Sequence, residues 1–143
     1  MGKALVEAIP PEACVIAYNN SFEKFVVKSL ASYYPEGALR LKGIHDHILD
    51  LMQPFKKRHY YHTDMKGSHS LKNVLPVLVP ELSYRGMEIG DGTGANRAYG
   101  ALEAIEDVEK AEAIKGYLLE YCKLDTLAMV KIVDRLWKIV EEA

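Results

Sequence analysis

The stretch Ala13-Cys-Val-Ile-Ala-Tyr18 decides the fold class that the sequence predicts. A continuous apolar run of this kind is typical of a strand that is buried on both faces of a sheet. Asn19-Asn-Ser21 then turns the chain, and the residues from Ser21 to about Tyr34 have the pattern of a helix. Because a strand covered on both faces needs helices above and below it, this unit predicts an α/β fold. The side chains expected on the inner side of the helix are Phe22, Val26, Ser29 and Leu30.

Glu23 falls in the first turn of this predicted helix and has two interpretations. Together with Asn20 it fits a capping box in which Asn stands in for Ser or Thr, and position alone favours this interpretation. However, an acid just past the end of a buried strand also lies where α/β folds place their functional sites.

Leu118 to Val130 has the pattern of the front half of a long helix that runs to about Ile139. One stripe at helical spacing consists of Leu118, Cys122, Asp125, Met129, Ile132 and Leu136. Asp125 is the one polar member, and Tyr121, a turn earlier, can direct its hydroxyl to the same place. A carboxylate on a buried stripe needs a partner, and a metal ion is one such partner. Alternatively, the helix breaks near Leu124 and Asp125 caps its second half, which spacing alone favours.

Length and composition fit a single soluble domain. The 143 residues are 49% hydrophobic, which is sufficient for a core. No apolar run approaches the length of a membrane span and the N-terminus lacks a signal pattern, so we expect a cytoplasmic protein. Cys14 and Cys122 lie in apolar runs without CxxC spacing, which predicts buried free thiols. A net charge of −2 gives no global attraction for nucleic acid.

The middle of the chain contains three features with more than one interpretation. His45 and His47 have the spacing of metal ligands, but surface histidines beside an acid are commoner. Ile48 to Met52 has the pattern of a short strand or helical turn with Asp50 at its end, a candidate supporting carboxylate. From Gln53 to Gly67 basic residues alternate with tyrosines, which suits a single-stranded nucleic-acid face and fits an exposed loop equally well.

The second half of the chain also contains helix boundary signals. Ser68 or Ser70 is expected to cap a helix to about Val79, which Pro76 shortens or kinks. Gly90-Asp-Gly-Thr-Gly94 lacks the Gly-Lys-Ser/Thr ending of a phosphate-binding loop and is predicted to be a turn. Thr93 is expected to cap a helix from Gly94 to Ile105, and the next helix is expected to start at Val108.

Taken together, these motifs resemble those of the DEDD (DnaQ-like) 3′–5′ exonucleases in the ribonuclease-H-like superfamily. Tyr18-Asn-Asn-Ser-Phe-Glu23 resembles the second exonuclease motif: Asn19, Phe22 and Glu23 match, with Glu in place of the usual Asp. Tyr121-Cys-Lys-Leu-Asp125 resembles the third motif in its Tyr-x-x-x-Asp form. The stretches 67–80 and 120–130 are similar to a family of uncharacterised bacterial proteins in which a DEDD-type domain is the C-terminal part of a longer chain. The resemblance covers nearly everything from Ala4 to Leu136.

The resemblance implies metal-dependent phosphodiester hydrolysis, in which two divalent ions held by four carboxylates clamp the attacking and leaving oxygens. It implies that Asp125 ligates a metal, that Glu23 ligates or supports it, and that Tyr121 orients the attacking water. The ion would be Mg²⁺ or Mn²⁺, because these prefer oxygen ligands. The substrate would be an end of single-stranded DNA or RNA, contacted by Asn19 and Lys72, although Lys72 is equally well explained as an ordinary helix lysine.

One departure from the family pattern limits this expectation. The first motif, Asp-x-Glu on an opening strand, is absent before Ala13, where Glu7 and Glu12 lie on a predicted helix and a Pro-rich turn. We therefore expect residues 1–143 to be the C-terminal part of one ribonuclease-H-like domain, helix-rich, with one or two strands of the central sheet. Without two of the four carboxylates it should be inactive alone, and its unpaired strand or helices should lead to a homodimer. The alternatives are a non-catalytic nucleic-acid or protein-binding module with a decayed nuclease site, or a plain helical interaction domain.

Overall fold

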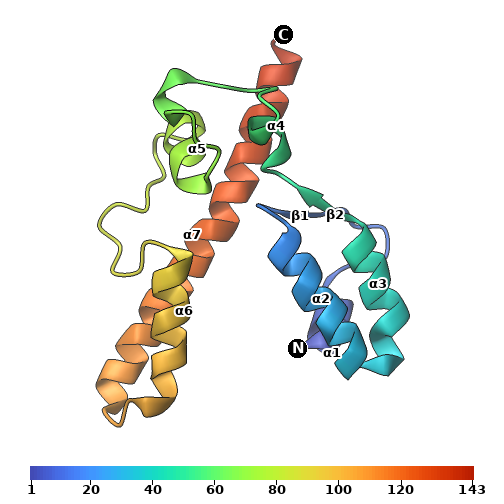
Figure 1. Cartoon of the computed structure of the whole chain (residues 1–143), viewed down its shortest axis with the longest axis vertical. Coiled ribbons are helices and arrows are strands. Elements are labelled where there is room, and N and C mark those ends of the chain that lie inside the picture. Colours follow the sequence, from blue (N-terminus) through green and yellow to red (C-terminus); the bar gives the residue numbers. More distant parts are fainter. The chain divides into compact units, whose positions relative to one another are not determined.

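A computed structural model describes every residue of the chain, 1–143, as two units (Figure 1). The N-terminal unit contains residues 1–63 and 69–71, and the C-terminal unit contains residues 64–68 and 72–143. The expectation that all 143 residues belong to one ribonuclease-H-like domain stays a prediction.

The N-terminal unit is built from short helices and two short strands. In chain order these are α1 (Gly2–Ala8), β1 (Val15–Ala17), α2 (Ser21–Tyr33), the 3-10 turn η1 (Pro35–Gly37), α3 (Ala38–Asp46), β2 (Ile48–Asp50) and α4 (Gln53–Lys56). A second 3-10 turn, η2 (Thr63–Met65), follows, of which only Thr63 belongs to this unit. Prolines determine where two helices end: α1 ends before Pro10, and α2 ends before Pro35, whose ring disfavours helical geometry at Tyr34.

The two strands form a parallel sheet. Val15 lies opposite Ile48, Ile16 opposite Leu49, and Ala17 opposite Asp50. Parallel strands need a crossover connection, which α2 and α3 supply. The predicted strand–turn–helix unit is confirmed, as is the mixed α/β class with two strands present.

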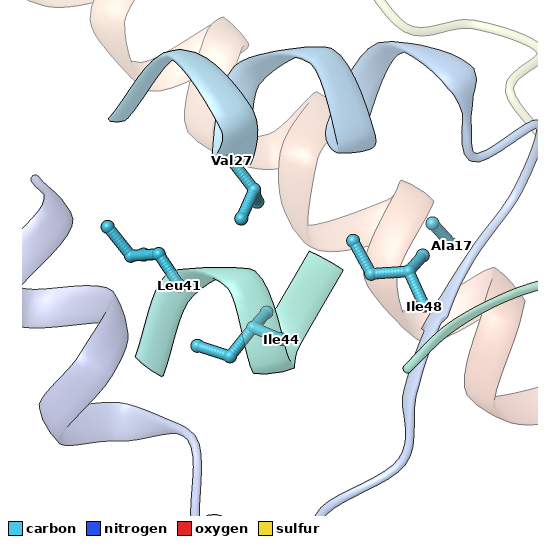
Figure 2. Packing of buried hydrophobic residues seen from close by; sticks show 5 residues of the cluster. All are labelled: Ala17, Val27, Leu41, Ile44 and Ile48. Carbon is cyan, nitrogen blue, oxygen red and sulfur yellow. The ribbon is translucent and has the colours of Figure 1, made fainter. Parts of the chain in front are cut away.

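The core of the N-terminal unit lies on one face of this sheet. Its buried members, shown in Figure 2, are Ala17, Val27, Leu41, Ile44 and Ile48. Because side chains alternate along a strand, Ile16 and Leu49 point to the opposite face, where they are 38% and 58% exposed. The prediction that the strand is buried on both faces is therefore wrong for this chain. The predicted self-association through strand or helices stays a prediction.

The inner side of α2 differs from the predicted one. Val27 is its buried residue, Val26, Ser29 and Leu30 are partly buried, and Phe22 is 71% exposed. Val27 lies five positions after Phe22, which corresponds to a rotation of about 140° around the helix axis. The stripe that contacts the core is centred on Val27, so Phe22 falls outside it.

The C-terminal unit is formed by helices alone. They are α5 (Leu71–Leu78, of which Leu71 is grouped with the N-terminal unit), α6 (Gly92–Ala101), the 3-10 turn η3 (Leu102–Ala104) and α7 (Val108–Glu141). Figure 1 shows α6 beside the first part of α7, and the two are in contact. Pro76 lies inside α5, which continues to Leu78. None of the helices, α7 included, combines the length and the apolar character that a bilayer span requires.

The helix boundaries confirm some of the predicted caps and correct others. α7 starts at Val108, as predicted, and its cap is Asp107. The helix is continuous through Asp125, so the alternative in which Asp125 caps a second helix is wrong. α6 starts at Gly92, and its cap is Asp91, which accepts a hydrogen bond from the backbone nitrogen of Gly94 at 2.7 Å. The assignment of this role to Thr93 is therefore wrong.

Both cysteines are free, and both are exposed. The prediction of free thiols is confirmed, whereas the prediction that they are buried is wrong. In α7, Cys122 lies on the predicted apolar stripe but away from the buried residues Ala128 and Ile132, which lie further along the helix.

Gly37→Ala should destabilise the N-terminal unit by about 1–3 kcal/mol, the usual cost of overpacking. A Cβ atom at Gly37 would lie 2.1 Å from Cε1 and 2.4 Å from Cδ1 of Tyr34, whose ring packs against the core. The free energy of unfolding, measured by urea denaturation, tests this.

Gly43→Ala is the matched control, because the nearest atom to a Cβ there is Nη1 of Arg40 at 3.9 Å. Within α3 this substitution should be neutral or stabilise by about 0.5–1 kcal/mol. Equal effects at Gly37 and Gly43 would contradict the close approach of Tyr34.

Candidate functional site

The carboxyl ends of β1 and β2 bring polar residues together in the N-terminal unit. Asp50, the last residue of β2, accepts hydrogen bonds at Oδ1 from the backbone nitrogens of Asn19 (2.8 Å) and Met52 (3.0 Å). Its Oδ2 accepts from Nε2 of Gln53 at 2.9 Å. Burial opposes ionisation of Asp50, but these hydrogen bonds outweigh it and hold the pKa of the carboxyl below its usual value. Asp50 therefore fixes the turn after β1 as a charged acceptor.

Asn19 takes part in this arrangement through its backbone. It has a φ of 60°, in the left-handed region that asparagine tolerates better than most residues. Its carboxamide oxygen, Oδ1, accepts a hydrogen bond from the Ser21 hydroxyl at 3.3 Å. The substrate contact that the resemblance implies for Asn19 stays a prediction.

Glu23 lies in the first turn of α2 without the predicted capping box. The carboxamide of Asn20 donates to the carbonyl oxygen of Ile48 at 3.1 Å and makes no hydrogen bond to the helix, so the capping-box interpretation is wrong. Oε2 of Glu23 is buried and has no hydrogen-bond partner. Because burying a carboxylate oxygen without a donor costs free energy, Glu23 is an unsatisfied group that a ligand or a water molecule can satisfy.

Tyr18 connects the end of β1 to a distant loop. Its hydroxyl donates to the carbonyl oxygen of His69 at 2.7 Å, and its ring is stacked on Phe55 with centroids 6.4 Å apart. Burial, and then the charge of Asp50, raise the pKa of Tyr18 well above the usual tyrosine value. The phenol therefore stays protonated and keeps donating at neutral pH.

In the C-terminal unit, two phenols lie beside the carboxylate of Asp125. Tyr84 donates a hydrogen bond to its Oδ1, and Tyr121, one turn earlier on α7, interacts with the same carboxylate. The two rings lie 6.1 Å apart and are tilted by 47°. The predicted convergence of Tyr121 and Asp125 is therefore present, and the carboxylate on the stripe is paired.

The pKa of each phenol is raised well above the usual tyrosine value. For Tyr84 the causes are burial and then the hydrogen bond and charge of Asp125. For Tyr121 they are burial, the charge and hydrogen bond of Asp125, and the charge of Asp91. Both hydroxyls therefore remain protonated at neutral pH.

Sequence reasoning missed Tyr84. It is 41 residues before Asp125 and lies in the irregular segment between α5 and α6. Nothing in the local pattern marks this tyrosine, because its contact with α7 depends on the path of the segment.

Lys72 and Asp91 form an ion pair in the same unit, with Nζ and Oδ2 3.5 Å apart. The backbone nitrogen of Gly94 and then the charge of Lys72 lower the pKa of Asp91. A Cβ atom on Gly92 would lie 3.8 Å from the hydroxyl of Tyr121, so the start of α6 is close to Tyr121. The phosphate contact expected of Lys72 stays a prediction, and its amino group has Asp91 as its partner here.

A pocket of about 620 Å³ opens beside Tyr84. Its lining consists of Lys72, Leu75, Pro76, Pro80, Ser83, Tyr84, Arg85 and Gly90. The volume lies within the range of small-molecule sites, and two cations among apolar side chains suit an anionic ligand with an apolar part.

The structure does not assemble a metal site from this chain alone. No three His, Cys, Asp or Glu side chains are placed to hold a metal ion. His45 Nδ1 pairs with Oδ1 of Asp46 at 2.8 Å, and His47 Nδ1 pairs with the carbonyl oxygen of Gly43 at 2.7 Å, so neither Nδ1 is free for a ligand. Glu23 belongs to the N-terminal unit and Asp125 to the C-terminal unit, and their convergence stays a prediction.

The chain is similar to a described protein family and to another protein, and neither description names an activity. A family model described as Domain of unknown function (DUF2779) matches residues 1–70. An uncharacterised protein of Ureaplasma parvum serovar 3 is 27% identical over 163 aligned residues, which cover 99% of this chain and 23% of that protein. The chain thus spans less than a quarter of the length of this relative. No solved structure matches the chain.

Proposed function

We propose that this chain is part of a DEDD-type, 3′–5′ exonuclease-like domain that hydrolyses phosphodiester bonds, and that the chain alone is inactive. The observation that supports the proposal best is the pairing of Tyr121 with Asp125 on one face of the unbroken helix α7. This is the arrangement that the Tyr-x-x-x-Asp motif requires. The position of Glu23 in the first turn of the helix after a parallel strand supports the match to the second motif.

The side chains of the C-terminal unit have separate roles in this proposal. Tyr84 donates to Asp125 and, with Tyr121 beside the same carboxylate, orients it. Lys72 and Arg85 line the adjacent pocket and attract a phosphate group. Tyr121 is close enough to Asp125 to orient a water molecule that the carboxylate also holds.

A divalent metal supplies Lewis acidity in nucleases of this type. The residues of this chain do not complete such a site, since only Asp125 and the unsatisfied Glu23 remain as candidates in their respective units. We therefore assign no chemical step to a metal here. In the proposal, Mg²⁺ or Mn²⁺ binds only where a longer protein adds further carboxylates.

Nucleotide release from a 5′-labelled single strand tests the proposal. A longer protein that includes this chain should release nucleotides with Mn²⁺ and release none with EDTA, whereas this chain should release none under either condition. Hydrolysis by the chain alone would contradict the need for further carboxylates. Binding of the strand without hydrolysis by the longer protein would contradict the proposal itself.

The second candidate is a non-catalytic nucleic-acid or protein-binding module with a decayed nuclease site. Two observations favour it: Glu stands at position 23 where the family motif has Asp, and no three-ligand cluster is present. It requires binding without turnover in both the chain and the longer protein.

A further inference from the structure

The end of α4 and the turn after it carry a group of basic residues that the proposed hydrolytic site does not use. Lys56, Lys57, Arg58 and His59 are consecutive and all exposed. From Leu51 to Thr63 the sequence contains no Asp or Glu, and none of these four side chains forms an ion pair. We call Lys56–His59 the basic turn.

The backbone of the basic turn is held by specific hydrogen bonds. The backbone nitrogen of His59 donates to the carbonyl oxygen of Pro54 at 2.8 Å. The backbone nitrogen of Arg58 donates to the carbonyl oxygen of Phe55 at 3.1 Å. Arg58 has a φ of 58°. These are the features of a Schellman helix ending, in which the left-handed residue is usually glycine. Arginine costs more free energy than glycine in this left-handed conformation, so its presence there is consistent with a function for its charge.

Both flanks of the basic turn are anchored in the N-terminal unit. Phe55 is buried, is stacked on Tyr18, and has the ring of Tyr60 edge-on at 6.1 Å. Phe55 precedes the turn and Tyr60 follows it. Also before the turn, Asp50 accepts a hydrogen bond from Gln53, the first residue of α4. The cations are therefore presented by a preformed turn, which reduces the ordering cost when a ligand binds.

We propose that the basic turn, together with the exposed ring of Tyr61, is a binding surface for single-stranded nucleic acid. Lys56, Lys57 and Arg58 would contact consecutive phosphates, and Tyr61 is 52% exposed and available to stack on a base. An aromatic ring beside the cations favours a single strand, because bases in a duplex are already stacked. The proposal requires neither Asp125 nor a metal ion.

Fluorescence anisotropy of a labelled oligodeoxythymidylate of about 20 nucleotides, with the full chain and EDTA present, tests this surface. Each phosphate contact with a single strand contributes about 0.7 to the slope of log affinity against log salt, so Lys56→Gln/Lys57→Gln/Arg58→Gln should reduce the slope by about 2. Between about 50 and 200 mM salt the wild type should lose roughly 20-fold more affinity than this variant. Tyr61→Ala should weaken binding at least about fivefold, and Tyr61→Phe should retain it.

Two further variants keep the test decisive. Arg58→Gly suits the left-handed backbone, so it should fold and still reduce the slope by about 0.7. Lys131→Gln/Arg135→Gln/Lys138→Gln removes the same charge from exposed positions of α7 and should leave the slope unchanged.

Three results would overturn the proposal. The first is that the wild type does not bind the oligonucleotide, and the second is that the α7 control reduces the salt slope as much as the basic-turn variant. The third is that the basic-turn variant no longer binds phosphatidylserine vesicles that the wild type binds, while its binding to the oligonucleotide is intact. The last would assign the basic turn to a membrane surface. Because EDTA prevents metal-dependent hydrolysis, failure here is distinguishable from failure of the proposed nuclease function.

Discussion

Asp125→Ala should reduce Mn²⁺-dependent nucleotide release by a longer protein that includes this chain at least about 10³-fold. The carboxylate accepts a hydrogen bond from Tyr84 and interacts with Tyr121 beside it. Asp134→Ala, an exposed acid further along α7, is the matched control and should leave the rate unchanged. A rate within tenfold of wild type for Asp125→Ala would exclude the proposed role.

The same substitution has a readout in this chain that does not depend on activity. Removing the charge and acceptor of Asp125 should lower the pKa of both phenols toward the usual value of about 10. When folding raises the pKa of a phenol, its contribution to the free energy of unfolding is complete below about pH 10, the pKa of tyrosine in the unfolded chain. As the pH rises further this contribution is lost, because the phenol loses its proton in the unfolded chain before it does so in the folded one. Asp125→Ala should therefore weaken the alkaline loss of stability.

NMR titration of the tyrosine rings and urea denaturation at several alkaline pH values measure these two effects. Asp125→Asn separates charge from hydrogen bonding: it keeps an oxygen acceptor, so its effect on the pKa of Tyr84 should be smaller than that of alanine. Unchanged ring titrations in both variants would show that the phenols do not depend on Asp125.

Leu41→Ala should lower the free energy of unfolding of the N-terminal unit by about 2–5 kcal/mol. Leu41 is 0% exposed and belongs to the cluster with Val27 and Ile44 in Figure 2, so truncation leaves a cavity between α2 and α3. This loss is a large part of the stability of a small unit. Leu39→Ala, on the same helix but 86% exposed, should change stability by less than about 0.5 kcal/mol.

Circular dichroism during urea denaturation measures this loss, while fluorescence of Trp137, the single tryptophan, follows the C-terminal unit. If Leu41→Ala and Leu39→Ala have similar unfolding midpoints, the assignment of Leu41 to the core is wrong.

The sequence predicted the elements whose signals are local. The apolar run before Asn19 and the turn after it were sufficient to predict β1 and α2, and the spacing from Leu118 onward predicted α7. The errors occur where two local signals compete. Aspartate is frequent at helix caps, but α7 continues through Asp125 because the phenols of Tyr84 and Tyr121 are the partners of its carboxylate. Similarly, Asp91 rather than Thr93 caps α6, since the helix starts two residues before Gly94.

The candidate site was predictable only in part. Tyr121 and Asp125 are one helical turn apart, so their proximity follows from α7 alone. Tyr84 contacts Asp125 across 41 residues of chain, and no periodicity encodes such a contact. Asp50 was a candidate from its position at a strand end, but its hydrogen bonds to Asn19 and Gln53 depend on the parallel register of β1 and β2.

Ile16 and Leu49 also matter for handling the purified chain. Adjacent exposed aliphatic side chains favour association at high concentration, and each strand pairs with a neighbouring strand along one edge alone. Threonine keeps the β-branch of Ile16 and introduces one at position 49, a shape that strands accommodate, and it adds a hydroxyl group in place of apolar surface at both positions. The pair is therefore the first place to modify when samples for spectroscopy or crystallisation precipitate.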